Sequence, residues 1–209
     1  NMTRLIARLD IKSENLIKGI RFEGLRVIGN PNLYAQKYYQ GGVDEILYLD
    51  TVATLYGRNN LNNIVNKTVE QIFVPIAVGG GLFSANSCFD AFNNGADKIC
   101  INTSFIENPN LIRDLVNIFG SANIVSSIEA KKINTNKWEA YTHNGRERSY
   151  KDVKDWIKFV QDSDVGEILV TSIDKDGTRK GFDLDLIYEL SKVSYKPLMI
   201  GGGFGELSH

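Results

Sequence analysis

The chain has 209 residues, of which 43% are hydrophobic and 23% are charged, and this balance excludes disordered and fibrous proteins. Its 24 basic and 25 acidic side chains give a formal net charge of -1, so nothing in the bulk charge attracts nucleic acid or an anionic membrane. A chain of this length can bury one sizeable core, and we expect a single domain over residues 1–209.

Short runs of aliphatic and β-branched residues predict strands, and longer amphipathic segments between them predict helices. In chain order these are strand 4–11, helix 31–40, strand 45–50, helix 60–71, strand 75–78, helix 84–94, strand 98–101, helix 109–119, strand 123–128, helix 151–161, strand 167–171, helix 184–193 and strand 197–200. Regular alternation of this kind is typical of βα units and predicts an α/β fold with a parallel sheet.

The sequence also repeats itself, with related segments roughly 120 residues apart. The pairs are Asp10-Ile11-Lys12 with Glu129-Ala130-Lys131, Glu45-Ile46-Leu47 with Glu167-Ile168-Leu169, and Val78-Gly79-Gly80-Gly81 with Ile200-Gly201-Gly202-Gly203. Two copies of a four-unit half-barrel make a (βα)8 TIM barrel, which we favour over an open doubly wound sheet. The partner of strand 98–101 would fall beyond His209, so we expect the eighth βα unit to be absent and the barrel to be incomplete at its C-terminus.

Polar residues follow the predicted strands, at the edge where TIM barrels carry their active sites. Asp10 ends the first strand and Glu129 ends the fifth, so the repeat would place two carboxylates on opposite sides of one barrel mouth. Two carboxyl groups in different surroundings can protonate and deprotonate one substrate. We therefore predict that Asp10 and Glu129 are a catalytic acid/base pair, although either one alone would more often be a helix cap.

Two glycine runs, Gly79-Gly80-Gly81 and Gly201-Gly202-Gly203, each follow a predicted strand. Backbone N–H groups in such turns can approach an anion closely, and the repeat gives one phosphate site for each half. The segments Asn102-Thr103 and Asp176-Gly177-Thr178 follow neighbouring strands and would complete the two sites with hydroxyl and amide donors. Ordinary turn chemistry is the alternative for these polar residues.

Other reactive side chains give little support to a different chemistry. Cys88 and Cys100 lie in apolar segments without a second Cys or His at ligand spacing, so the sequence predicts neither a disulfide framework nor a metal site. His143 and His209 form no convincing nucleophile–base pair with a cysteine, and we interpret the basic loop 144–148 as a solvated hairpin.

No run approaches the roughly 18 apolar residues that span a bilayer, and we expect a cytoplasmic protein.

The sequence resembles the cyclase subunit of imidazole glycerol phosphate synthase, an enzyme of histidine biosynthesis. The resemblance spans essentially the whole chain and depends most on the specific run Thr171-Ser172-Ile173-Asp174-Lys175-Asp176-Gly177-Thr178. Further matching motifs are Leu9-Asp10-Ile11-Lys12, Val78-Gly79-Gly80-Gly81, Gly95-Ala96-Asp97-Lys98, Ile101-Asn102-Thr103, Asn108-Pro109 and Gly166-Glu167-Ile168-Leu169.

The resemblance implies a lyase and cyclase that uses ammonia from a glutaminase partner to split a bis-phosphorylated phosphoribulosyl nucleotide, without metal or cofactor. The products would be imidazole glycerol phosphate and an aminoimidazole ribotide. Asp10 would then be one catalytic residue, and Lys18, Asp50, Asn102 and Thr171 would line the site. The family's ammonia gate, a ring of charged side chains at the N-terminal end of the barrel, would comprise Arg4, Glu45, Lys98 and Glu167. A purely structural ring of salt bridges is the alternative.

Some positions depart from the family's pattern. Glu129 stands where an aspartate is usual, and Asn144 and Gly201 stand where serines are usual. Segments 22–29 and 55–59 resemble paralogues associated with surface polysaccharides, which would use ammonia to convert an acetamido sugar to an acetamidino sugar. Two further alternatives are a barrel that only docks and activates a glutaminase, and a phosphoribosyl isomerase that needs no ammonia.

Overall fold

A computed structural model describes residues 5–12, 15–20, 24–51, 61–81, 83–174 and 183–201, with the backbone alone described for 15–20 and 24–29. The chain divides into two compact units. The first unit comprises Asn1–Lys18 and Leu25–Ile99, and the second comprises Gly19–Gly24 and Cys100–His209. The boundary between them along the chain falls inside strand β6 (Lys98–Ile101). The two units are described in turn.

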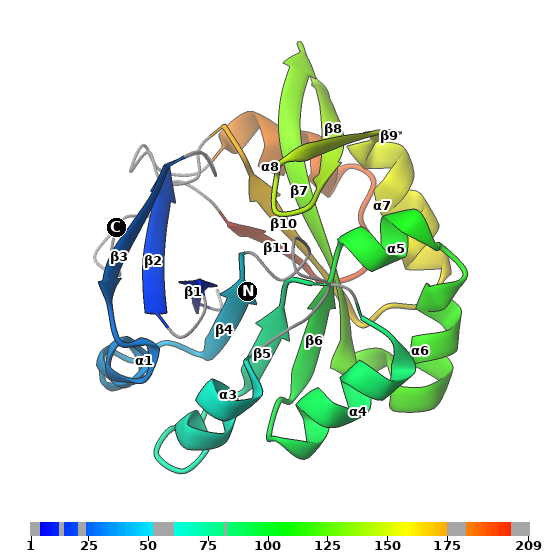
Figure 1. The fold of residues 1–209 in the computed structure, drawn as a ribbon. Helices are drawn as coiled ribbons and strands as arrows, with labels where there is room; N and C mark the ends of the chain where they lie inside the picture. The colour runs from blue at the N-terminus through cyan, green and yellow to red at the C-terminus, as the bar shows by residue number, and fades with distance from the viewer. Residues whose placement is uncertain are drawn as a thin grey trace. The chain divides into compact units, whose positions relative to one another are not determined.

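Parallel strands form the centre of the first unit. Strand β1 (Ile6–Lys12) pairs with β4 (Glu45–Asp50), which pairs in turn with β5 (Ile76–Gly79), all in parallel. Strand β2 (Asn15–Ile20) folds back against β1 in antiparallel register, and β3 (Gly24–Gly29) follows it along the chain (Figure 1). Every residue of β4 and β5 is buried, as expected for strands that are covered on both faces.

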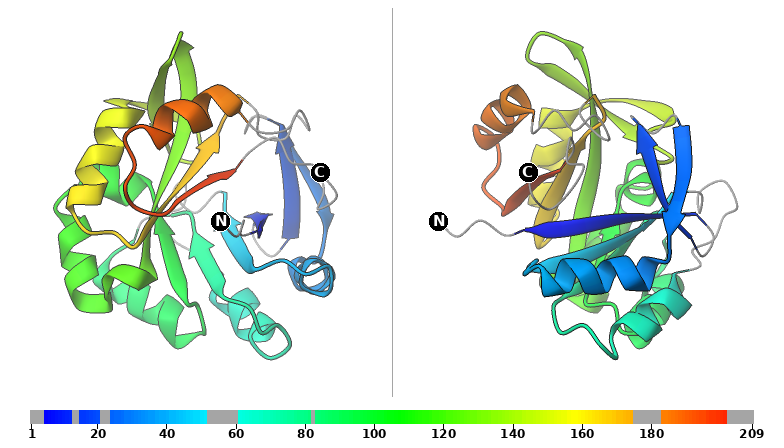
Figure 2. Two further views of the ribbon diagram at one scale, coloured as in Figure 1. Left: turned by 180° about the vertical axis from the view of Figure 1, so that it is seen from behind. Right: turned by 90° about the vertical axis from the view of Figure 1, so that its left-hand side faces the viewer.

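The helices of the first unit begin at the caps that their sequences supply. Helix α1 (Pro31–Gln40) has proline at its first position, and the Asn30 side chain accepts hydrogen bonds from the first-turn N–H groups. Helix α3 (Asn62–Thr68) lies beside α1 (Figure 2), and the Asn32 amide of α1 donates to the carbonyl of Ile64 and the hydroxyl of Thr68. Helix α4 (Ala85–Asn93) begins with a capping box of Ser84 and Ser87.

Parallel strands also form the centre of the second unit. Strand β7 (Ile124–Asn134) pairs with β10 (Glu167–Ser172), which pairs with β11 (Leu198–Gly201). On its other side β7 pairs with β8 (Lys137–Thr142), and β8 pairs with β9 (Glu147–Asp152), both in antiparallel register. The last part of β7, Lys131–Asn134, is exposed, and Figure 1 shows β7 and β8 projecting together past the end of β10.

The second unit also contains the remaining helices. They are α5 (Thr103–Glu107), α6 (Leu111–Phe119), the 3-10 turn η1 (Ser121–Asn123), α7 (Val153–Asp162) and α8 (Leu184–Ser191). Asp152 caps α7 by accepting from the N–H of Asp155, and Asp183 caps α8 by accepting from the N–H of Leu186. Each cap holds a helix start close to the end of the strand that precedes it in the chain.

The structure confirms the predicted α/β class. Each strand and helix expected from hydrophobic periodicity is present, with ends that differ by a few residues, and the pairing among the central strands of each unit is parallel. This parallel-rich arrangement is consistent with a TIM barrel. The additional strands β2, β3, β8 and β9 and the short helix α5 were not predicted. The predicted hairpin at 144–148 is confirmed as the connection between β8 and β9.

Candidate active site

Two acidic residues lie near the carboxyl ends of neighbouring strands in the first unit. Asp10 lies near the end of β1, and Asp50 is the last residue of β4. The β1–β4 register pairs Ile11 with Asp50, so the two carboxyl groups belong to adjoining strand ends. Arg8 orients Asp10, because its Nε lies 3.2 Å from Asp10 Oδ1 and its Nη2 lies 3.4 Å from Oδ2. Asp50 is buried, whereas the Asp10 side chain retains some exposure.

The first glycine run lies against the same strand end. The backbone φ angles of Gly80 and Gly81 are 84° and 97°, in the left-handed region that glycine adopts without strain. A Cβ atom at Gly80 would lie 2.1 Å from the carbonyl oxygen of Asp50, closer than any side chain allows. Glycine therefore lets this turn pack directly on the backbone of Asp50 at the carboxyl edge of the sheet.

Three of the predicted site residues lie side by side in the second unit. Thr171 on β10 is in register with Glu129 on β7 and with Gly201 on β11. Residues opposite one another on neighbouring parallel strands direct their side chains to the same face. Glu129 and Thr171 are both buried, so this face carries a carboxyl group and a hydroxyl group within the folded unit.

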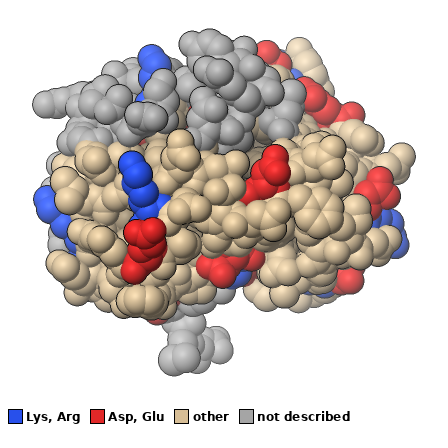
Figure 3. Space-filling model, turned by 60° about the horizontal axis from the view of Figure 1, so that its bottom comes forward, with Lys and Arg blue, Asp and Glu red and all other residues tan. Residues whose placement is uncertain are grey.

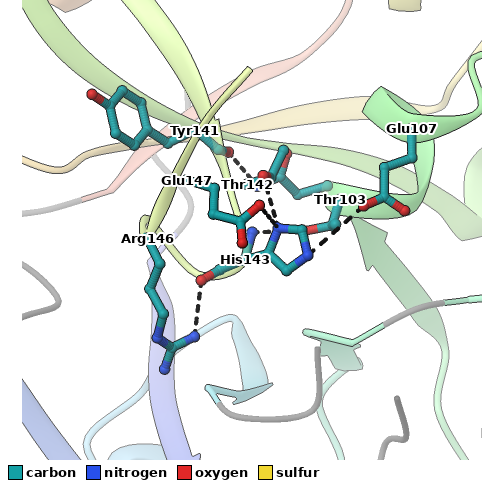
Figure 4. Close-up of polar contacts among 8 residues, drawn as sticks. Thr103, Glu107, Tyr141, Thr142, His143, Arg146 and Glu147 are labelled. Carbon is teal, nitrogen blue, oxygen red and sulfur yellow. Dashed lines mark hydrogen bonds and ion pairs between the residues drawn. The ribbon is translucent and has the colours of Figure 1, made fainter. Parts of the chain in front are cut away.

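Asn102 and Thr103, at the start of α5, contact the β8–β9 hairpin (Figure 4). The Asn102 amide Nδ2 donates to the carbonyl of Tyr141 at 2.9 Å, and Thr103 Oγ1 accepts from the backbone N–H of His143 at 3.0 Å. Tyr141 is in turn the register partner of Glu129. Sequence reasoning assigned Asn102 and Thr103 to a phosphate site, and the structure shows in addition that they tie the hairpin to the start of α5.

Comparison with known proteins identifies the family of this chain. The family model described as histidine biosynthesis protein matches residues 4–209. The imidazole glycerol phosphate synthase subunit HisF of Legionella pneumophila is 53% identical over 204 residues, which cover 98% of this chain and 96% of the relative. The chain belongs to the family of imidazole glycerol phosphate synthase cyclase subunits.

Other members of the family are also similar over nearly the whole chain. The HisF subunit of Pyrococcus furiosus is 42% identical over 206 residues, covering 99% of this chain and 82% of the relative. The HisF subunit of Petrotoga mobilis is 40% identical over 205 residues, covering 98% of this chain and 81% of the relative. These relatives confirm the resemblance inferred from the motifs and give no support to the glycan-amidination alternative.

The charged residues assigned to the family's ammonia gate lie at strand starts. Lys98 Nζ lies 2.5 Å from Glu45 Oε1 in the first unit, and the Glu45 side chain is only 4% exposed. Glu167 is buried at the start of β10 in the second unit, where it is in register with Val125. Arg4 lies outside the described residues. Of the predicted ring, the described residues include the ion pair of Lys98 with Glu45.

Other predicted residues fall outside the described part of the chain. These are Asp176, Gly177, Gly202 and Gly203, and for Lys18 only the backbone of β2 is described. Among the residues that the structure describes, no cluster of His, Cys, Asp and Glu could hold a metal ion, and no helix is long and apolar enough to cross a membrane. On the face shown in Figure 3, the charged side chains of described residues are interspersed among uncharged ones without a broad patch of one sign.

Sequence reasoning missed several side chains that the structure brings to the candidate site. Arg8 precedes Asp10 by two residues, so the period of a strand places both on one face, and that spacing could have revealed the pair. The contacts of His143 with Glu107 and Glu147 depend on the hairpin and could not be found by spacing along the chain.

Cys88 and Cys100 are both buried and form no disulfide. Burial raises the pKa of the Cys88 thiol to about 12, so this thiol is unreactive at neutral pH.

Proposed function

We propose that this chain is the ammonia-dependent lyase and cyclase subunit of a glutamine amidotransferase complex in histidine biosynthesis. It would act on a bis-phosphorylated phosphoribulosyl nucleotide and release imidazole glycerol phosphate and an aminoimidazole ribotide. The observation that carries the proposal is the 53% identity to a named HisF subunit over 98% of the chain. The proposed localisation is the cytoplasm, where the other enzymes that handle such phosphorylated metabolites reside.

In the proposed mechanism, Asp10 and Glu129 exchange protons with the substrate as a catalytic acid/base pair. Glu129 is buried beside Thr171, while Asp10 is partly exposed and paired with Arg8, and such different surroundings suit one acid and one base. Lys18, Asp50, Asn102 and Thr171 would line the substrate site. The proposed reaction requires no metal or cofactor.

The two phosphate groups of the substrate would bind at the two glycine runs. Gly80 and Gly81 present a left-handed turn at the end of β5, packed on Asp50, which supports the first site. Thr103 would add a hydroxyl group there, since its oxygen accepts from His143 and its proton is still available to donate. Asp176, Gly177, Gly202 and Gly203 would form the second site with the end of β10.

The proposed partner is a glutaminase subunit that supplies ammonia at the opposite end of the strands. The Lys98–Glu45 ion pair supports an entrance there, because both residues stand at strand starts and hold a buried charge pair. Arg4 and Glu167 would complete the ring. A barrel that only docks a glutaminase would retain this ring but would not turn over substrate, so the assay below separates the two.

The test is incubation of the purified chain with the phosphoribulosyl nucleotide and an ammonium salt, followed by measurement of released aminoimidazole ribotide. The chain should turn over, and Asp10→Asn and Glu129→Gln should each lower kcat by about 100-fold or more. Glu129→Asp, which keeps a carboxyl group, should retain more activity than Glu129→Gln. The exposed substitutions Asp90→Asn and Glu70→Gln are matched controls and should leave kcat unchanged. Absence of product from the unaltered chain would overturn the proposal.

A further inference from the structure

The turn between β8 and β9 has an unusual backbone. His143, Asn144 and Gly145 have φ angles of 54°, 56° and 81°, so three consecutive residues adopt the left-handed conformation. Only glycine adopts this conformation without strain, and strained residues persist only where their surroundings hold them. The contacts of this turn therefore identify what holds it in place.

The backbone of His143 is fixed from two sides (Figure 4). Its N–H donates to Thr103 Oγ1 at 3.0 Å, and its carbonyl oxygen accepts from Arg146 Nη1 at 2.8 Å. Thr103 belongs to α5 and is buried, so the turn is anchored to a rigid part of the second unit. The Arg146 guanidinium closes the turn on itself.

The imidazole ring of His143 connects three elements. Nδ1 lies 2.9 Å from the Thr142 hydroxyl and 3.1 Å from Glu147 Oε2 at the start of β9, while Nε2 lies 3.7 Å from Glu107 Oε1 on α5. The titratable and charged groups that face this part of the turn among the described residues are Glu107, Glu147 and Arg146. The ring therefore lies between Glu147 of β9 and Glu107 of α5.

The turn is coupled to Glu129 by backbone register. Tyr141, two residues before His143, is in register with Glu129 on β7, and its carbonyl oxygen accepts from Asn102 Nδ2 at 2.9 Å. The hairpin is therefore held to the α5 region at two successive points, Asn102 to Tyr141 and Thr103 to His143. A shift of the turn would be transmitted along β8 to the strand that carries the proposed catalytic carboxyl group.

We propose that His143 is a positioning residue for Glu129 that acts through the β8–β9 hairpin. This inference rests on the proposed function, in which Glu129 exchanges a proton with substrate. The contacts of His143 with Thr103, Glu107 and Glu147 hold the turn of the hairpin, and the hairpin is paired with the strand that carries Glu129.

The test compares His143→Gln and His143→Ala with Lys137→Ala, an exposed substitution at the opposite end of β8. Both His143 variants should lower kcat by about 10-fold with KM within twofold, because positioning rather than binding is lost. Lys137→Ala should leave both kcat and KM unchanged. Glu107→Gln should give an intermediate decrease in kcat, since one of the two carboxylate partners remains.

A second readout does not depend on turnover. Hydrogen exchange at the amides of Tyr141, His143 and Arg146 should be slow in the unaltered chain and in Lys137→Ala, and faster in His143→Gln. Failure of the proposed function would appear as no turnover by the unaltered chain. The exchange data would still decide whether the contacts of His143 hold the hairpin in place. Unchanged kcat and exchange in both His143 variants would overturn the inference, and so would a lowered melting temperature with unchanged kcat for folded protein.

Discussion

The glycines of the two runs differ in what their surroundings require. At Gly80, φ is 84° and a Cβ atom would lie 2.1 Å from a backbone oxygen of Asp50, which cannot move without displacing β4. At Gly201, the nearest atom to a Cβ would be Thr171 Oγ1 at 3.7 Å, an ordinary contact. These two glycines hold different positions in the repeat, since Gly201 corresponds to Gly79, and of the two Gly80 is sterically required and Gly201 is not.

This contrast gives a stability prediction. Gly80→Ala should lower the free energy of unfolding by about 2 kcal/mol or more, because it combines left-handed strain with overpacking. Gly201→Ala should change it by less than about 1 kcal/mol, in the stabilising direction, because the unfolded chain loses conformational freedom. Urea unfolding of both variants measures the difference. Equal losses at the two positions would contradict the described packing of the first run.

At the scale of elements, the hairpin of β8 and β9 is held by an ion pair between its strands. Arg148 donates to Glu139 through Nε at 3.0 Å and Nη2 at 2.8 Å, a bidentate geometry. These hydrogen bonds hold the pKa of Glu139 below its usual range, against the opposing effect of burial. The same guanidinium lies 4.4 Å from the ring centre of Tyr150, so it contacts both Glu139 of β8 and Tyr150 of β9.

The pH dependence of this pair follows from the direction of the pKa shift. A carboxyl group whose pKa is lower in the folded state stabilises the protein above its unfolded pKa, near 4.3, and that stabilisation is lost as pH falls through the folded pKa. Arg148→Met should therefore lower the free energy of unfolding at pH 7 and lower it by less at pH 3, and the effect should be modest because the Arg148 side chain is half exposed. Thermal unfolding across pH, with Lys137→Met as the control, measures this. A loss independent of pH would contradict the assignment.

The parallel strands and their helices could be predicted, because buried strands such as β4 and amphipathic helices such as α6 carry clear periodicity. Strand β9 could not, since none of its residues is buried and they lack an alternating pattern. The prediction that Glu129 ends its strand was wrong, because β7 continues to Asn134 as the first arm of a hairpin with β8, whereas Thr171 does lie next to the end of β10. The ties from Asn102 and Thr103 to Tyr141 and His143 span about 40 residues and depend on strand β8, which was not predicted, so periodicity and motif could not reveal them.

At the scale of the whole molecule, the proposed ammonia gate would connect stability with partner function. Glu45 at the start of β4 is almost fully buried beside Lys98 at the start of β6, and β5 lies between these two strands in the sheet. Removing the Lys98 ammonium while the Glu45 carboxylate stays buried should lower the free energy of unfolding more than replacing both charges, because a buried ionised group needs a nearby opposite charge. The proposed gate can therefore be altered with limited loss of stability only by a paired substitution.

Lys98→Met should lower the free energy of unfolding by about 3 kcal/mol, and the double variant Glu45→Gln, Lys98→Met should recover part of that loss. In complex with a glutaminase, the double variant should lose glutamine-supported turnover relative to turnover with ammonium salt. The ratio of the two rates measures passage of ammonia through the gate. An unchanged ratio would leave the pair with a structural role alone and contradict the proposed entrance.

The exposed end of the β7–β8 hairpin has a practical consequence for observing the molecule in solution. Residues 131–137 are all exposed and turn at Asn136, whose φ of 56° marks a tight reversal. Both native thiols are buried, so a cysteine introduced at Asn136 would be the residue that a maleimide dye modifies first among the described positions. The dye would be attached to the exposed end of the β7–β8 hairpin, outside the core. Its fluorescence anisotropy would report the local motion of that end.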